Sequence, residues 1–234
     1  MQFLNVAHIN VRSLVPKFHD VVDCVLSKEI DILALSESWL TANINSNNLL
    51  INDFILFRRD RLGRGGGVCL YVRSGLRPKL LGSNDSFEQL WITVRVSHML
   101  LTVGVIYKPP NADYKAFIDS LEESLSFYGS SSDGVVCLGD VNINILNLAG
   151  PATLYFNDML SSFDLRQVID ELDVLLLSNH LITNVVRVED FPGSDHDMVF
   201  CNLDLRRPGL RPTFKVIRDF RNLNYAETWA SSYF

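Results

Sequence analysis

The chain has 234 residues, of which 47% are hydrophobic and 21% charged, and its net charge is −6. This composition supplies a sizeable core and excludes a disordered or collagen-like chain. A chain this acidic cannot bind nucleic acid through its bulk charge, so any such binding needs a local basic patch or metal ions.

The first elements alternate between strand and helix. Phe3–Ile9 is a mostly apolar run that predicts a strand, and Ile30–Leu35 predicts a short buried one. Between them, Lys17–Ser27 carries apolar residues at helical spacing, with Pro16 near its start. The chain is therefore expected to open as a β-α-β unit.

Further strands and only two more helices follow. A glycine-rich turn, Gly63–Gly67, leads into them. Helices are expected over Tyr114–Leu125 and Pro151–Phe163. Strands are expected over Val68–Val72, Trp91–Val96, Leu100–Ile106, Val135–Leu138, Val174–Leu177 and Met198–Leu203. This pattern predicts an α/β fold with two sheets covered by helices, over residues 1–205. Residues 206–234 are expected to form a linker or tail.

Polar residues lie at the ends of the expected strands. They are Asn10, Arg12, Glu37, Tyr107, Asp140, Asn142, Asp173, Asp195 and His196. Sites in α/β sheets form at the carboxyl ends of strands. Carboxylates and amides suit a hard metal ion such as Mg²⁺ with an anionic substrate. Each residue alone is weak evidence, because Asp-x-Asn after a strand is usually a turn.

The order of these motifs carries more information than any one of them. The blocks are HINVRSLVPKFHDV, DILALSESWL, RRDRLGRGGGVCLYV, VIYKPPN, VCLGDVNIN and GSDHDMVF. In this order they resemble the endonuclease/exonuclease/phosphatase superfamily, and more narrowly the endonuclease domain of LINE-type (non-LTR, jockey-like) retrotransposons. The resemblance covers about residues 2–205, and FKVIRDFRNLN resembles the linker after that domain.

The resemblance implies a four-layered, deoxyribonuclease-I-like α/β sandwich and a role for each motif residue. Glu37, Asn10 and Asp195 match residues at the metal. Asp140 matches the aspartate that orients or deprotonates the attacking water. Asn142 matches the neighbouring residue that holds a phosphate oxygen. Tyr107 matches the tyrosine near the scissile phosphate. His196 matches the catalytic histidine, and Asp173 the carboxylate that orients it. The implied cofactor is Mg²⁺ or Mn²⁺.

The chemistry of phosphodiester hydrolysis needs the same residue types. Negative charge develops on the phosphate oxygens, so a divalent ion and hydrogen-bond donors must face it. A carboxylate is needed to position water. An anion beside His196 would favour the imidazolium form, since it raises the histidine pKa. The other histidines, His8, His19, His98 and His180, show no metal-ligand spacing.

An arginine-rich segment is the other candidate for DNA contact. Arg58, Arg59, Arg61 and Arg64 precede the glycines, and Arg12 follows the first strand. A phosphate-gripping loop and a solvated turn are equally good interpretations, since an acidic nuclease needs local positive charge. The glycines lack the closing Gly-Lys-Ser/Thr of a P-loop, so a tight turn or close packing is expected.

The sequence departs from the family pattern at one place. Asp170-Glu171 runs directly into Leu172-Asp173, where relatives carry a further strand or hairpin. A segment is expected to be missing there. This puts in doubt the substrate-facing rim, the Asp173–His196 pairing and activity itself.

These observations predict a metal-dependent DNA endonuclease that nicks target DNA for retrotransposition. A catalytically impaired remnant and a related phosphodiesterase acting on RNA or phospho-head groups remain open alternatives. By resemblance, partners besides DNA are element RNA and a downstream reverse transcriptase, which would make this chain a fragment.

Cellular context follows from simple features. The four cysteines lack a CxxC spacing, which favours a reducing compartment and core positions for Cys69, Cys137 and Cys201. No apolar run reaches the ~18 residues of a membrane span, and no basic leader follows Met1. A nuclear or cytoplasmic protein, neither secreted nor membrane-bound, is expected.

Overall fold

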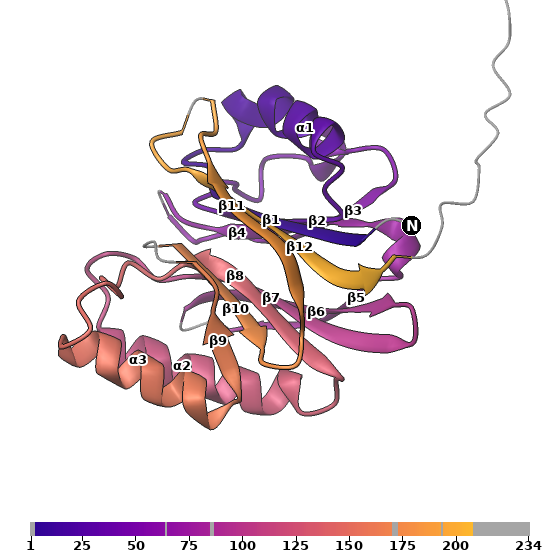
Figure 1. The fold of residues 1–234 in the computed structure, drawn as a ribbon. Helices are drawn as coiled ribbons and strands as arrows, with labels where there is room; N and C mark the ends of the chain where they lie inside the picture. The colour runs from indigo at the N-terminus through magenta and orange to yellow at the C-terminus, as the bar shows by residue number, and fades with distance from the viewer. Residues whose placement is uncertain (1–2, 64, 85–86, 170–172, 193, 208–234) are drawn as a thin grey trace, which may run out of the picture.

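Two six-stranded sheets pack face to face in the computed structural model, which describes residues 3–63, 65–84, 87–169, 173–192 and 194–207. The upper sheet in Figure 1 has the order β11 (Thr183–Glu189), β12 (Met198–Arg206), β1 (Phe3–Asn10), β2 (Ile32–Ser36), β4 (Val68–Arg73) and β3 (Phe54–Arg59). The lower sheet has the order β5 (Lys79–Asn84), β6 (Glu88–Val96), β7 (Met99–Tyr107), β8 (Gly134–Asp140), β10 (Asp173–Ser178) and β9 (Leu165–Gln167).

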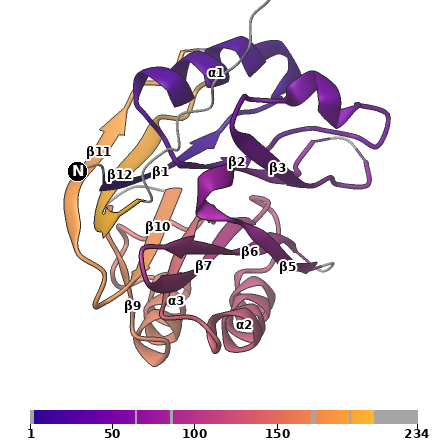
Figure 2. The ribbon, with the colours of Figure 1, turned by 90° about the vertical axis from the view of Figure 1, so that its right-hand side faces the viewer.

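Helices cover the outer face of each sheet. α1 (Phe18–Ser27) lies over the upper sheet, while α2 (Tyr114–Ser124) and α3 (Pro151–Ser162) lie beneath the lower one (Figures 1 and 2). Three apolar clusters fill the spaces between these layers. The expected four-layered α/β sandwich and all three expected helices are confirmed.

Each sheet contains one parallel pair made by a strand–helix–strand crossover. β1 and β2 are parallel through α1, and β7 and β8 are parallel through α2. Parallel strands end at the same edge of a sheet, so the residues after β1, β2, β7 and β8 meet at one end of the sandwich.

Alternation along the strands decides which side chains enter the space between the sheets. In β1, Leu4 and Val6 belong to the central core, whereas Ala7 and Ile9 pack under α1. The inward positions continue as His8 and Asn10, both fully buried. β2, β6, β7, β8 and β10 also carry polar residues at inward positions where they reach this end of the sandwich. The apolar layer between the two sheets therefore gives way there to a layer of polar side chains.

The sequence did not predict four strands, β3, β5, β9 and β11. All four are the edge strands of the two sheets. An edge strand is less buried and more polar than an interior one, so its hydrophobic alternation is weak. β5 has no buried residue, and β9 has only three residues.

The domain extends slightly beyond its expected limit at residue 205. β12 continues to Arg206, and the Arg207 guanidinium pairs with the fully buried Asp31. The rest of the expected tail, residues 208–234, lies outside the described residues. All four cysteines are buried and free, which confirms the expected core positions of Cys69, Cys137 and Cys201. Among the described residues, no helix is both long and apolar enough to cross a membrane.

Candidate active site

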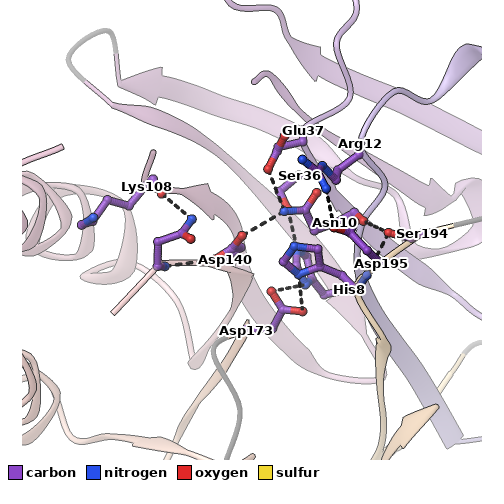
Figure 3. A network of polar contacts seen from close by, with 12 residues as sticks. His8, Asn10, Arg12, Ser36, Glu37, Lys108, Asp140, Asp173, Ser194 and Asp195 are labelled. Carbon is purple, nitrogen blue, oxygen red and sulfur yellow. Dashed lines mark hydrogen bonds and ion pairs between the residues drawn. The ribbon is translucent and has the colours of Figure 1, made fainter. Parts of the chain in front are cut away.

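Polar side chains from both sheets converge at the end of the sandwich where β1, β2, β7 and β8 finish (Figure 3). The ladder of β7 with β8 sets Tyr107 beside Asp140, and that of β8 with β10 sets Asp140 beside Asp173. The β1–β2 ladder ends with Asn10 beside Ser36, so that Glu37 follows at once. These residues are far apart in sequence and reach one place because they occupy inward positions at the same end.

Asn10 links the two sheets. Its Nδ2 donates to Glu37 Oε1 at 3.0 Å and to Asp140 Oδ2 at 2.9 Å. Its Oδ1 is buried and accepts no hydrogen bond from any described residue. A buried acceptor without a donor costs free energy unless a ligand or water satisfies it. This oxygen, next to two carboxylates, therefore fits a site for a hydrated cation.

Asp140 is held from two sides at the end of β8. The backbone N–H of Asn142 donates to Oδ1 at 2.9 Å, and Asn10 donates to Oδ2. The Asn142 side chain is anchored in turn on the carbonyl of Lys108 at 2.9 Å. Burial raises the pKa of Asp140 above its usual range, although these bonds and the nearby His196 act in the opposite direction. The carboxylate is thus fixed in orientation and only partly solvated.

Asp173 lies between two histidines. His196 Nδ1 is 4.0 Å from Asp173 Oδ2, and His8 Nδ1 is 3.8 Å from Asp173 Oδ1. The backbone of His196 is positioned by Ser194, whose Oγ accepts from its N–H and donates to the carbonyl of Asn10. The expected proximity of Asp173 and His196 is present, and β10 keeps its register with β8.

His8 is the residue that sequence reasoning missed. It is fully buried, and its Nε2 forms a 3.0 Å hydrogen bond with Ser36 Oγ. Burial, with a smaller contribution from the charge of His196, lowers the pKa of His8 to about 3. The ring is therefore neutral at pH 7 and supports Asp173 without competing as a cation. The feature that could have identified His8 is its position two residues before Asn10, which places both side chains on the same face of the strand.

Three side chains form the tightest set of possible metal ligands among the described residues. Ligand atoms of Asp140, Asp173 and His196 all lie within 4.8 Å of one another. The metal residues expected from the resemblance were Glu37, Asn10 and Asp195. Asn10 adjoins this set through its bond to Asp140, and Glu37 adjoins it through Asn10, but Asp195 is exposed and pairs with Arg12. An oxygen-rich site of this kind suits Mg²⁺ or Mn²⁺.

Tyr107 and Glu88 complete the wall beside Glu37. Tyr107 is buried, and burial followed by the charge of Glu37 raises its pKa, so it remains a neutral donor. Glu88 accepts from the backbone N–H of Gly67 and pairs with Arg61 at 3.1 Å. A Cβ at Gly66 would lie 2.6 Å from Glu88 Oε1. Gly66 and Gly67, where an added Cβ would lie 2.6 Å from Glu88 and 2.7 Å from Ser38 Oγ, are therefore needed for the close packing that was expected of the glycines.

Four residues at the site have a strained backbone conformation. Arg12, Glu37, Trp39 and Asn142 have positive φ values of 39°, 52°, 52° and 46°. Non-glycine residues adopt this region rarely, and such strain persists where surrounding contacts impose it. The Trp39 indole donates to Glu37 Oε2 at 3.2 Å, so the strained turn holds both Glu37 oxygens.

The arginines of the segment from Arg58 to Arg64 have different surroundings. Arg58 donates to Asp60, to the carbonyls of Thr41 and Ile44 and to Ser46, so its guanidinium is committed to the protein and not to phosphate. Arg59 and Arg61 line a hollow of about 340 Å³ that also contains Glu88 and Pro109, next to the site. Arg64 lies outside the described residues.

A larger hollow lies elsewhere and is not the site. It measures about 420 Å³ and is bordered by Gly134 and Ser178, at the ends of β8 and β10 farthest from Asp140 and Asp173. None of the expected site residues lines it. Convergent polar groups therefore locate the active site better than cavity size does.

Comparison with known proteins agrees with this geometry. A profile of the Endonuclease/Exonuclease/phosphatase family matches residues 4–196. The chain belongs to this family. No curated protein matches the sequence. Family membership accounts for the two packed sheets and for the position of the polar cluster at one end.

Solved structures with the same fold are distant in sequence. The endonuclease domain of TRAS1, a telomere-specific non-LTR retrotransposon, is 12% identical with a TM-score of 0.69, over 87% of this chain and 100% of that one. The AP endonuclease LMAP from Leishmania major is 13% identical with a TM-score of 0.71, over 88% and 89%. The 3′ phosphatase NExo from Neisseria, bound to a product DNA hairpin, is 17% identical with a TM-score of 0.65, over 86% and 99%. These similarities establish the fold of this family member.

The suspected deletion falls largely outside the described residues, which omit 170–172. On either side, β9 and β10 pair antiparallel, and Gln167 bonds with the backbone of Asp173 and Leu175. The Asp173 strand is therefore not displaced. The deletion itself and its effect on activity stay predictions.

Proposed function

We propose that this chain is a metal-dependent phosphodiesterase that nicks DNA, as the endonuclease domains of non-LTR retrotransposons do. The observation that carries the proposal is the contact of Asn10 with both Glu37 and Asp140, beside the Asp173–His196 pair. This arrangement provides carboxylates for water and metal, together with donors for a phosphate, in one partly buried place. A bound Mg²⁺ or Mn²⁺ would offset the negative charge that develops on the phosphate oxygens.

The roles of the chain's own residues follow from their contacts. Asp140, held by Asn142 and Asn10, orients a water molecule for attack on phosphorus. The water oxygen forms a bond to phosphorus and gives its proton to Asp140, while the P–O3′ bond breaks. The leaving oxygen takes a proton from solvent to give the 3′-hydroxyl from which reverse transcription would start, and the other product carries the 5′-phosphate. His196, oriented by Asp173, and neutral Tyr107 donate toward the phosphate oxygens.

A plasmid-nicking assay tests the proposal directly. We expect the purified chain to convert supercoiled plasmid to the open circle with Mg²⁺ or Mn²⁺ and to stop when EDTA is added. His196→Ala should slow nicking by roughly 10²–10⁴-fold, because a donor to the phosphate is lost. His180→Ala, which removes an exposed histidine elsewhere, is the matched control. Nicking that continues in EDTA, or that survives His196→Ala, would sink the proposal.

The alternatives predict different substrates. A duplex with one abasic site, a duplex ending in 3′-phosphate, an RNA strand and a phosphorylated head group should be compared with intact plasmid. Faster cleavage of one of these would reassign the substrate within the family. No turnover of any substrate, despite a folded chain that binds Mn²⁺, would favour the catalytically impaired remnant. The short connection before Asp173 is the feature that supports this second candidate.

The proposed context follows the same resemblance. The partners proposed are target DNA, element RNA and a reverse transcriptase encoded downstream, and the proposed location is the nucleus or cytoplasm. These proposals rest on the motif order and on the likeness to the TRAS1 endonuclease fold.

A further inference from the structure

Four arginines surround a hollow at the end of the sandwich opposite the active site. It measures about 370 Å³ and is lined by Gly75, Arg77, Arg95, Ser97, Arg206 and Arg207. No acidic residue is among these lining residues. Arg206 pairs with Phe3 at the start of β1, whereas Asn10 is at its end. The eight residues of β1 separate the two places by roughly 23 Å, at about 3.3 Å per residue.

The pairing of the arginines distinguishes this hollow from an ordinary charged surface. The guanidinium groups of Arg77, Arg95 and Arg206 form no hydrogen bond or ion pair with any described residue. Every other described arginine has a partner, such as a carboxylate or a backbone carbonyl. The three arginines whose side chains lack a partner among the described residues therefore all line the same hollow. This is notable in a chain whose net charge is −6.

Arg207 forms the fixed wall of the hollow. Its side chain is only 4% exposed, and its guanidinium pairs with buried Asp31 and, at 3.8 Å, with Glu29. Its Nε is buried and has no acceptor among the described residues. Arg73 also pairs with Asp31, at 2.7 Å, so the two acidic groups are balanced by Arg73 and Arg207. The charges of Arg77, Arg95 and Arg206 remain uncompensated by any described residue.

We propose that this hollow is a second binding site, separate from the active site, for ligands that carry phosphate groups. Guanidinium groups match phosphate oxygens in a forked geometry and form strong charge-assisted hydrogen bonds. A single carboxylate would neutralise only one of three charges, whereas a diphosphate or consecutive phosphodiesters match all three. The ligand is either a free polyphosphate or the backbone of a nucleic-acid strand, and the active site cannot hold the same phosphate group across that distance.

Calorimetric titration of the full chain tests the proposal, with EDTA present so that the active site lacks metal and cleavage cannot occur. One arm uses pyrophosphate and the other a 12-nucleotide thymidine strand, both at low ionic strength. The test variant is Arg77→Gln/Arg95→Gln. Its control is Lys115→Gln/Arg187→Gln, which removes the same charge from exposed positions outside the hollow.

We expect binding to the wild-type chain with a dissociation constant below about 1 mM. The test variant should bind at least about tenfold more weakly, because charged contacts are lost, while the control stays within about twofold. A loss confined to pyrophosphate supports a free polyphosphate ligand, and a loss confined to the strand supports a nucleic-acid backbone.

The proposal is overturned if neither probe binds, or if the control loses as much affinity as the test variant. Melting temperatures establish that each variant is folded. If the double variant does not fold, the single variant Arg206→Gln is tested in its place, and Arg187→Gln is its control. The same losses of affinity then support or overturn the proposal.

Discussion

The two ends of the sandwich hold their charged groups in different ways. At the active-site end, Glu37, Asp140 and Asp173 project from inward strand positions or the turn that follows (Figure 3). Glu88 lies beside Tyr107 in the ladder of β6 with β7. At the other end, Arg77, Arg95 and Arg206 lie exposed around a hollow. The first end buries its polar groups between the sheets, while the second leaves most of its charge in solvent.

Because of this difference, we expect the first end to carry out catalysis and the second end only to bind anions. Burial raises the pKa of Glu88 and Asp140 and lowers that of His8, so the active-site end contains groups whose protonation depends on the fold. Exposed arginines attract anions without such tuning. Changes at the first end should alter the rate of catalysis or acid stability, and changes at the second should alter only binding of phosphate.

The largest effect is expected from Asp140→Asn. Removing the charge that orients water should reduce nicking by roughly 10²–10⁴-fold while the shape is kept. Asp158→Asn, an equal charge change on the exposed face of α3, should nick like the wild type. Initial rates of plasmid nicking measure both, and similar rates for the two variants would remove Asp140 from the mechanism.

The next effect concerns the short connection before Asp173. Inserting a family-like segment between Asp170 and Leu172 should raise nicking by up to about 10²-fold, since misplacement of a substrate-facing rim by ~1 Å can cost that much. The melting temperature should not change, because flanking core residues such as Leu165 and Leu175 are already buried. The prediction is wrong if the insertion leaves nicking unchanged, or if the native chain is unfolded without it. Either result would show that the short connection before Asp173 does not limit activity in the way proposed.

A smaller effect is expected at His8. His8→Gln removes the ring beside Asp173 and the bond to Ser36, so His196 should lose orientation and the turnover rate should fall about tenfold with little change in KM. His98→Gln, on an exposed turn, serves as control. A purely structural role for His8 would instead lower the melting temperature and leave the turnover of the folded fraction intact.

The smallest effect is on acid stability. In the unfolded chain His8 takes up a proton near its usual pKa of 6.5, but in the folded chain only near 3. Between these values the unfolded state binds more protons, so the free energy of unfolding falls as the pH is lowered through this window. The decline should be about 1 kcal/mol per pH unit steeper in wild type than in His8→Gln.

Urea denaturation from pH 6.5 down to pH 4 measures this difference. The raised pKa of Asp140 and Glu88 acts in the opposite direction in both proteins and therefore cancels in the comparison. Parallel curves for wild type and His8→Gln would mean that the ring is protonated in the folded state.

Interior strands and helices could be predicted, whereas edge strands could not. β1, β2, β7 and β8 are continuous apolar runs because both faces of each strand are covered. β11 alternates only partly, and three of its residues are exposed, because only one neighbour strand covers it. Local hydrophobicity reports burial, and edge strands are where burial is least.

The residues of the candidate site also include some that could be predicted from the sequence and some that could not. Asn10, Glu37 and Asp140 were identifiable because each polar residue interrupts the chain directly after an apolar strand. His8 was not, because it lies inside such a strand and resembles a core histidine. Arg58 was given a possible DNA contact that the structure assigns to Asp60 and the loop carbonyls instead. Side chains of one residue type take different roles, and only their neighbours distinguish them.

The sequence by itself determined the interior strands and the helices, the motif order and the residue types that phosphodiester chemistry needs, since these depend on local periodicity and spacing. The tertiary structure decided which groups meet. It placed Asn10 between Glu37 and Asp140, added His8 to the Asp173–His196 pair and gathered at the far end three arginines whose side chains have no partner among the described residues. Strand register sets these contacts, because a shift of one residue would turn every inward side chain to the other face.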